Sequence, residues 1–191
     1  MDNSNTTNRL LLATKELLLS VNNPDKITAR QIANHANVNL AMINYCFGSK
    51  DKLLKLAIDD IIALEFSQFV IEENASLKAK EKLKLLLYHV SKITIQYESI
   101  SRISIPYALL NAPIDLPDKI LPYIKEHFKG QKEENHCKML AYDIVSFMQL
   151  VFYRANEFYN YCGINLKNTE ELQLFIDSQL DLKLGGTTNE K

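Results

Sequence analysis

Apolar residues recur at spacings of three and four along most of the chain, which is the repeat of one face of an α-helix. This repeat predicts helices at residues 8–20, from residue 50 to about residue 71, at 76–98 and at 134–161, and a last helix that begins at Asn168. Few segments alternate with the period of two that strands require, and only five Gly and five Pro are present. The pattern therefore predicts an all-α protein.

Polar or proline-rich sequence separates these helices. Residues 1–7 and the tail 185–191 are polar, so we expect frayed or disordered ends there, and residues 21–25 have the composition of a turn. The lysine-rich first half of 76–98 predicts a solvated helix face. Between residues 105 and 123, prolines predict short helical pieces: Pro106, Pro113, Pro117 and Pro122.

Residues 28–54 predict two short helices joined by a tight turn, with a long helix directly after them. Thr28 and Gln31 match a capping box, which marks a helix start. Asn37 lies in the turn, where a backbone with positive φ is needed, and Asn tolerates that conformation best after Gly. The remaining boundaries are marked by residues that cap or break helices: Asn39, Gly48 and Ser49.

Several residues of this segment carry a resemblance to a known family. They are Thr28, Ile32-Ala33, Ala36, Val38 and the run Ile43-Asn44-Tyr45-Cys46-Phe47-Gly48-Ser49-Lys50, followed by Leu53-Leu54. With this run, the chain resembles the TetR family of bacterial transcriptional regulators over about residues 9–55. It departs from the family pattern at Cys46, where many members have His, and at Asn37, where many have Gly. The rest of the chain resembles the family only in its length and helical layout.

The resemblance implies a three-helix helix-turn-helix DNA-binding domain at residues 1–52. It also implies a helical ligand-binding and dimerisation domain at 53–184, followed by a disordered tail at 185–191. In such a motif the second helix lies in the major groove, and its first turns meet the bases. The implied function is a sequence-specific transcriptional regulator, a repressor that a small apolar ligand releases from a near-palindromic operator on double-stranded DNA.

The implied DNA contacts fall into two groups. Five residues face the groove: Asn39, Leu40, Ala41, Met42 and Asn44. Asn39 and Asn44 are expected to pair with adenine, and Leu40 or Met42 to touch a thymine methyl, with core packing as the alternative for these two apolar residues. Four further residues are expected to anchor phosphates: Thr28, Arg30, Tyr45 and Lys50.

Charge is distributed in the way that a DNA-facing end requires. Residues 1–55 contain seven basic and four acidic residues, a net charge of +3, whereas the remainder contains 15 basic and 19 acidic residues, a net charge of −4. The whole chain carries −1. A basic head on an acidic body fits nucleic-acid binding by one end of the molecule, although a difference of this size also arises by chance.

The predicted helix at 134–161 is apolar on several faces, so we expect it to be buried on more than one side. A two-fold homodimer would bury the surplus if 134–161 and 170–183 of each chain formed a four-helix bundle. The residues expected at that interface are Phe147, Val151, Phe158 and Phe175. A ligand pocket is expected near the proline-broken region, with ordinary core as the alternative for its aromatic lining: Tyr97, Tyr107, Tyr142, Phe147 and Tyr153.

Other functional classes find little support in the sequence. The four histidines are scattered and no hydrolase, metalloprotease, phosphate-loop or dinucleotide motif is present, so we expect no enzyme, no metal and no cofactor. The three cysteines show no zinc spacing, and the chain has no signal peptide and no membrane span, which predicts a cytoplasmic protein. The alternative to a regulator is a helical protein-interaction adaptor of the same fold with weak or no DNA binding.

Overall fold

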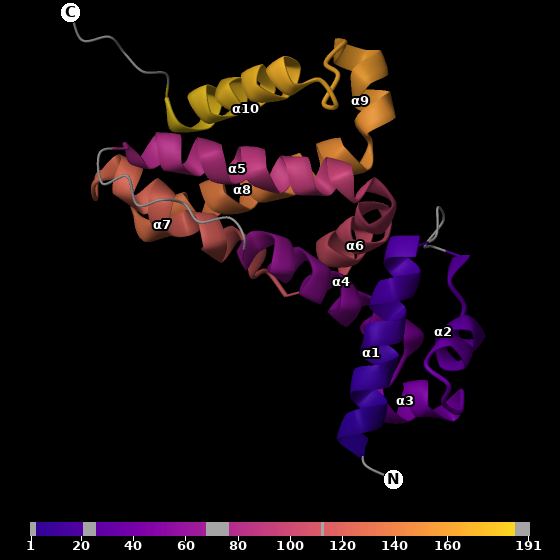
Figure 1. Ribbon diagram of the computed structural model, residues 1–191. Coiled ribbons are helices and arrows are strands. Elements are labelled where there is room, and N and C mark those ends of the chain that lie inside the picture. The colour runs from indigo at the N-terminus through magenta and orange to yellow at the C-terminus, as the bar shows by residue number, and fades with distance from the viewer. Residues whose placement is uncertain (1–2, 21–25, 68–76, 112, 186–191) are drawn as a thin grey trace, which may run out of the picture. The chain divides into compact units, whose positions relative to one another are not determined.

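The computed structural model of the chain describes residues 3–20, 26–67, 77–111 and 113–185. These residues form ten helices and no strand (Figure 1), so the predicted all-α class is confirmed. The helices group into two compact units. The first contains Met1–Val70 and Tyr97–Ser104, and the second contains Ile71–Gln96 and Ile105–Lys191.

The first unit packs four helices and part of a fifth around one core. They are α1 (Asn3–Ser20), α2 (Ala29–His35), α3 (Ala41–Phe47), α4 (Lys50–Ser67) and the beginning of α6 (Glu98–Leu110). Each of the first four helices contributes a side chain that is at most 1% exposed: Leu10, Ile32, Ile43 and Leu53. The first unit extends beyond the domain boundary that the sequence predicts at residue 52, because Ala57 and Ile58 of α4 are buried in the same core.

The second unit contains the remaining helices, and α7 packs against both α5 and α8. They are α5 (Ala79–Gln96), the end of α6, α7 (Leu116–Phe128), α8 (Glu134–Tyr153), α9 (Ala155–Cys162) and α10 (Thr169–Leu184). Figure 1 shows α10 beside α5. Two ion pairs join α5 to α10, one from Lys80 to Asp181 at 2.5 Å and one from Lys84 to Asp177 at 2.7 Å. The sequence predicted that the lysine-rich face of α5 is solvated. This prediction is only partly right, because α10 covers part of that face.

The single helix predicted at 134–161 is wrong, because α8 and α9 meet at a break. Arg154 has φ −108° and ψ 34°, outside the α-helical region. Neither Gly nor Pro causes this break. It turns α9 so that the Phe158 ring packs edge to face on Phe175 of α10, with the ring centroids 5.5 Å apart. Tertiary packing has overridden a continuous helical pattern here.

The ends and the prolines also differ from the sequence prediction. The first helix begins at Asn3, so most of the segment 1–7 is helical rather than frayed. Pro106 and Pro122 lie inside α6 and α7 and do not end them. The turn at 21–25, the end of the fourth helix beyond residue 67 and the tail 186–191 lie outside the described residues.

Candidate nucleic-acid interface

The start of α2 is fixed by the capping box that the sequence predicts. The Gln31 N–H donates to Thr28 Oγ1 at 3.2 Å, and the Thr28 N–H donates to Gln31 Oε1 at 2.8 Å. The Thr28 hydroxyl also donates to Gln31 Oε1 at 2.8 Å. This hydroxyl, expected to anchor a phosphate, therefore already has a partner for its proton and acts first as a helix cap.

The turn between α2 and α3 depends on a residue that the sequence analysis missed. Asn37 adopts the left-handed conformation expected of it, with φ 51°. Arg9 of α1 donates from Nη2 to the Ala36 carbonyl at 2.7 Å and to the Asn37 carbonyl at 2.9 Å. A basic side chain that bonds the last carbonyls of a helix stabilises its C-terminus. Nothing local in the sequence pairs Arg9 with residues 27 and 28 positions away.

Helix α3 presents a neutral face to solvent. Its residues Ala41, Asn44 and Tyr45 are exposed, and Leu40 just before it is 46% exposed. The helix contains no acidic or basic residue in its first or last turn. Met42 is an exception among the predicted groove residues, because it is half-buried and packs against the core of the first unit. Its assignment as a base contact is therefore corrected to core packing.

Asn39 caps α3 from the turn. Its Oδ1 accepts the Ala41 N–H at 2.9 Å, and its backbone oxygen accepts the Met42 N–H at 2.9 Å. The helix then ends at Gly48, which has φ 78°, and Ser49 caps α4 by accepting the Lys52 N–H at 3.2 Å. The caps predicted at Asn39 and Ser49 are both confirmed.

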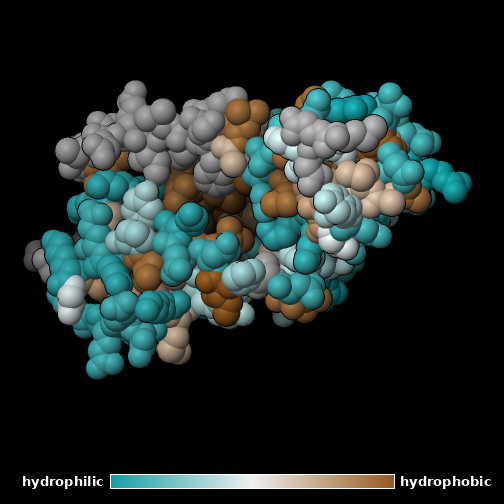
Figure 2. All heavy atoms as spheres, turned by 90° about the horizontal axis from the view of Figure 1, so that it is seen from below, coloured by the Kyte–Doolittle hydropathy of each residue, from teal (hydrophilic) through white to brown (hydrophobic). Residues whose placement is uncertain are grey.

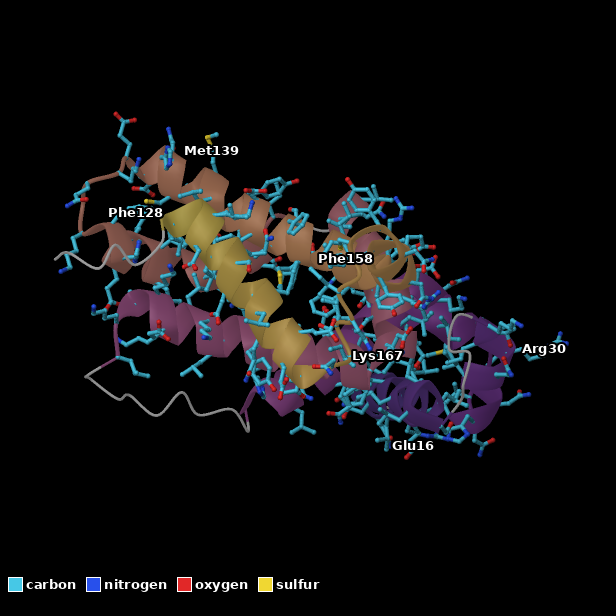
Figure 3. The ribbon with its side chains drawn as sticks, turned by 90° about the horizontal axis from the view of Figure 1, so that it is seen from above. Glu16, Arg30, Phe128, Met139, Phe158 and Lys167 are labelled. Carbon is cyan, nitrogen blue, oxygen red and sulfur yellow. The ribbon has the colours of Figure 1, made fainter. Side chains whose placement is uncertain are left out.

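Cationic side chains precede and follow α3 in the chain, and only some of them are available to a phosphate. Arg30 is exposed and projects away from α2 (Figure 3). Lys50 donates from Nζ to the Ile27 carbonyl at 3.1 Å, which ties the start of α4 to the segment before α2. Two exposed lysines that the sequence analysis did not select, Lys26 and Lys52, have no side-chain hydrogen bond or ion pair within the described residues.

The residues expected to line a ligand pocket do not converge. Tyr97 packs against the core of the first unit, whereas Phe147 packs in the second unit, its ring centroid 6.2 Å from that of Phe175. Tyr153 is 43% exposed. Tyr107 is half-buried and does not line the pocket between α6, α7 and α8.

One pocket of the second unit has a volume of ≈ 220 Å³. It lies between the end of α6, the start of α7 and one side of α8. Tyr142 lines it, alone among the five predicted residues. The other walls combine apolar side chains with a few polar ones, among them Leu109, Ile114, Asp115, Val145 and Ser146. Such a combination is typical of small-molecule sites.

The residues predicted at a dimer interface lie inside one chain. Val151 and Phe175 are each only 3% exposed and belong to the core of the second unit, while Phe147 and Phe158 are half-buried against that core. They are core residues rather than side chains available to a second copy. The large apolar residues that α8 and α10 do expose are others: Met139, Tyr142, Leu150, Tyr153, Leu174 and Leu182.

These exposed apolar residues are part of a mixed surface. Met139 is 70% exposed and points away from α8 (Figure 3). Leu174 and Leu182 are 66% and 78% exposed and lie eight residues apart, on one face of α10. On the side of the molecule shown in Figure 2, hydrophobic residues likewise reach the surface among hydrophilic ones.

Comparison with known proteins adds no relative. No protein-family model matches the chain, and no curated protein matches it in sequence. Among the residues that the structure describes, no helix has both the length and the apolar character that a membrane crossing requires.

Proposed function

We propose that the chain is a sequence-specific DNA-binding transcriptional regulator of the TetR type. The observation that carries this proposal is the face of α3. It presents exposed Asn44 and Tyr45, and it follows a capped α2 that bears the exposed cation Arg30. Amide side chains read base edges in the major groove, and cations beside them bind phosphates. Two further exposed cations, Lys26 before α2 and Lys52 in the first turn of α4, flank this segment in the chain.

The regulator acts as a two-fold dimer in this proposal. The exposed apolar residues of α8 and α10, Met139, Leu150, Leu174 and Leu182, form the self-complementary face in place of the phenylalanines selected from the sequence. A four-helix bundle from two copies buries such a face. Two copies then present their α3 helices to half-sites about 34–36 Å apart on the duplex.

The pocket in the second unit is our candidate site for a small-molecule effector. Its ≈ 220 Å³ accommodates a small amphipathic molecule, because an apolar cavity of about 150 Å³ already holds benzene. A ligand that alters DNA affinity has two-way coupling with the operator, so operator DNA must change ligand affinity by the same factor.

A protein-interaction adaptor is the second candidate, and the first unit offers an observation in its favour. Four leucines there are between 47% and 62% exposed: Leu12, Leu19, Leu56 and Leu64. Between them, Lys15 of α1 and Asp60 of α4 form an ion pair at 3.0 Å. An apolar surface on the unit that we assign to DNA is also what a partner helix binds.

Duplex binding at several salt concentrations tests the proposal against this alternative. Fluorescence anisotropy with DNA fragments enriched by the protein should give affinities that fall steeply as salt rises, because bound phosphates release counterions. Arg30→Ala should reduce the slope by about one counterion. Lys119→Ala, which removes an exposed cation from α7 in the second unit, is the matched control and should leave the slope unchanged. Absence of duplex binding would favour the adaptor.

Lys50→Ala separates anchoring from positioning in the same assay. Because Nζ of Lys50 bonds the Ile27 carbonyl, its loss should weaken binding together with thermal stability. Arg30→Ala should weaken binding at unchanged Tm, since its side chain has no hydrogen bond or ion pair within the described residues. If Lys50→Ala lowers the salt slope at unchanged Tm, the lysine binds phosphate directly and the positioning role is wrong.

A further inference from the structure

The turn between α2 and α3 sets the direction in which the proposed recognition helix α3 continues from α2. The Val38 N–H donates to the Ala33 carbonyl at 2.9 Å. The Asn37 N–H donates to the Asn34 carbonyl at 3.0 Å, and the two bonds together form a Schellman motif. Asn37 occupies the left-handed position of this motif, with φ 51°. Asn bears this conformation better than most residues, but only glycine adopts it without steric cost.

The carbonyls of Ala36 and Asn37 take no part in the Schellman motif, and both are bonded from α1. Nη2 of Arg9 donates to the Ala36 carbonyl at 2.7 Å and to the Asn37 carbonyl at 2.9 Å. A charged guanidinium donates stronger hydrogen bonds than a neutral group does. Helix α1 itself packs against both α2 and α3 (Figure 1). Arg9 therefore holds the left-handed residue of the turn from a third helix.

A comparison with Arg30 shows what is unusual about Arg9. Both arginines are exposed. The Arg30 side chain has no hydrogen bond or ion pair within the described residues, so its whole guanidinium is available to a phosphate. Arg9 already directs one nitrogen at two backbone carbonyls. Its Nε and Nη1 can still donate elsewhere, so a phosphate contact by Arg9 is the alternative that an experiment has to separate.

We infer that Arg9 is a positioning residue for base recognition, which holds the turn at Asn37 and thereby the orientation of α3. This inference rests on the proposed function. Base contacts in the major groove depend on how the recognition helix is oriented, whereas phosphate contacts give affinity for any sequence. Loss of Arg9 therefore lowers the discrimination between operator and unrelated duplex and leaves the electrostatic part of binding unchanged.

Fluorescence anisotropy with an enriched DNA fragment and with an unrelated duplex of the same length tests the inference. The specificity ratio is the affinity for the first duplex divided by the affinity for the second. Arg9→Met removes the donors and keeps an apolar stem, so the ratio should fall by about tenfold, the discrimination that one good base contact provides. The salt slope on unrelated duplex should not change. Arg30→Ala is the matched control, and it should lower the slope by about one counterion at an unchanged ratio.

Asn37→Gly provides the second half of the test, because glycine adopts φ 51° without steric cost. The Asn37 side chain is exposed and has no hydrogen bond in the part of the chain that the structure describes, so its removal breaks no contact of the first unit. Alone, Asn37→Gly should keep the wild-type ratio. Combined with Arg9→Met, it should restore most of the lost ratio, since the turn then depends less on the arginine. A lost phosphate contact would not be restored in this way.

The possible results separate cleanly. A lower salt slope for Arg9→Met at an unchanged ratio assigns the arginine to phosphate and overturns the inference. An unchanged ratio and slope overturn it too, as does a lower ratio that Asn37→Gly fails to restore. If circular dichroism shows Arg9→Met to be unfolded, the double variant decides: a folded double variant with a ratio near that of the wild type supports the inference, and any other result overturns it. Duplex binding without any enriched sequence overturns the inference but keeps DNA binding, whereas no duplex binding by the wild type overturns the proposed function as well.

Discussion

The helix caps of the first unit and the ion pairs of the second unit join residues at different distances along the chain. Around α2 and α3 of the first unit, the caps join near neighbours, such as Thr28 with Gln31 and Asn39 with Ala41, and among the described residues Arg9 alone reaches the turn from α1. In the second unit, Lys80 and Lys84 of α5 pair with aspartates of α10 that lie 101 and 93 residues away. Local contacts can be predicted from residue spacing, but distant pairs exist only once the helices have packed.

The same contrast applies to apolar residues. In the first unit, the recognisable run after residue 43 places Ile43 in the core and leaves its neighbour Asn44 exposed. In the second unit, neighbours are equally distinct: Leu174 is 66% exposed, whereas Phe175, which shares the buried stripe of Leu172, Ile176 and Leu180, is 3% exposed. What the spacing does not predict is the aromatic partner of Phe175, because Phe158 reaches it only through the break at Arg154.

Substitution of these two neighbours in α10 should give the largest effects. Phe175→Ala removes a buried ring and leaves a cavity, so the free energy of unfolding should fall by about 3–5 kcal/mol. Leu174→Glu alters a position that is exposed in the single chain, so the free energy of unfolding of the monomer should change by no more than about 0.5 kcal/mol. Urea denaturation followed by circular dichroism measures both values.

Dimer formation should respond to Leu174→Glu, the variant that has the smaller effect on the stability of the single chain. Leu174→Glu places a charge on the proposed dimer face, so sedimentation at micromolar concentration should show monomers that remain folded. Leu174→Ala is the milder control and should weaken the dimer less. A folded Leu174→Glu dimer with wild-type affinity would place the interface elsewhere on the molecule.

In the first unit, the corresponding test of stability is the removal of the helix cap at the start of α2. Thr28→Ala removes the side-chain cap, and the free energy of unfolding should fall by about 0.5–2 kcal/mol. Thr28→Ser restores the hydroxyl and should recover most of the loss. If Thr28 instead acts mainly on phosphate, Thr28→Ala will weaken DNA binding at unchanged stability, and thermal unfolding without DNA distinguishes these results.

The contrast between local and distant contacts explains which parts of the fold and of the candidate site the sequence predicts. The sequence predicts helices α2 and α3, the caps at Thr28, Asn39 and Ser49 and the left-handed turn at Asn37, because each depends on residues within a few positions. Arg9 was missed, since its partners at Ala36 and Asn37 lie on another helix. Of the five aromatic residues expected at a ligand pocket, only Tyr142 lines the described one, because an aromatic residue on a helix does not reveal which side will be covered, and Tyr97 belongs to the other compact unit.

A smaller effect is expected for the ion pairs that join α5 to α10. Lys84 and Asp177 are 33% and 38% exposed, so a double-mutant cycle with Lys84→Met and Asp177→Asn should give a coupling of about 0.2–1 kcal/mol. The coupling should shrink as salt rises, because exposed charges are screened. A cycle on Lys55 and Asp59, an i,i+4 pair in α4 at 2.5 Å, provides the local comparison. Equal coupling in both cycles would mean that the distance along the sequence decides whether an ion pair can be predicted, but not how strong the ion pair is.

The smallest expected effect is the titration of Glu134 at the start of α8. Hydrogen bonds from Lys138 and from Lys125 lower the pKa of this carboxyl below its ordinary value, and the charges of both lysines act in the same direction. A carboxyl with a lowered pKa in the folded state stabilises the fold above its unfolded pKa of about 4.3, and that contribution is lost as pH falls through the folded value.

Because Glu134 lies at the surface, the shift is better measured on the carboxyl itself than on stability. Its ¹³C resonance should titrate at a lower pH than in the Lys138→Ala variant, in which the pKa should rise toward its ordinary value. Lys125→Ala should raise the pKa less, since the hydrogen bond from Lys138 is the largest single cause of the lowered pKa and is the shorter contact, at 3.0 Å against 3.3 Å. Lys138 is four residues away on α8, whereas Lys125 reaches Glu134 from α7. The pair therefore compares a local with a distant partner on a single carboxyl, and a larger effect of Lys125→Ala would reverse the order that the geometry predicts.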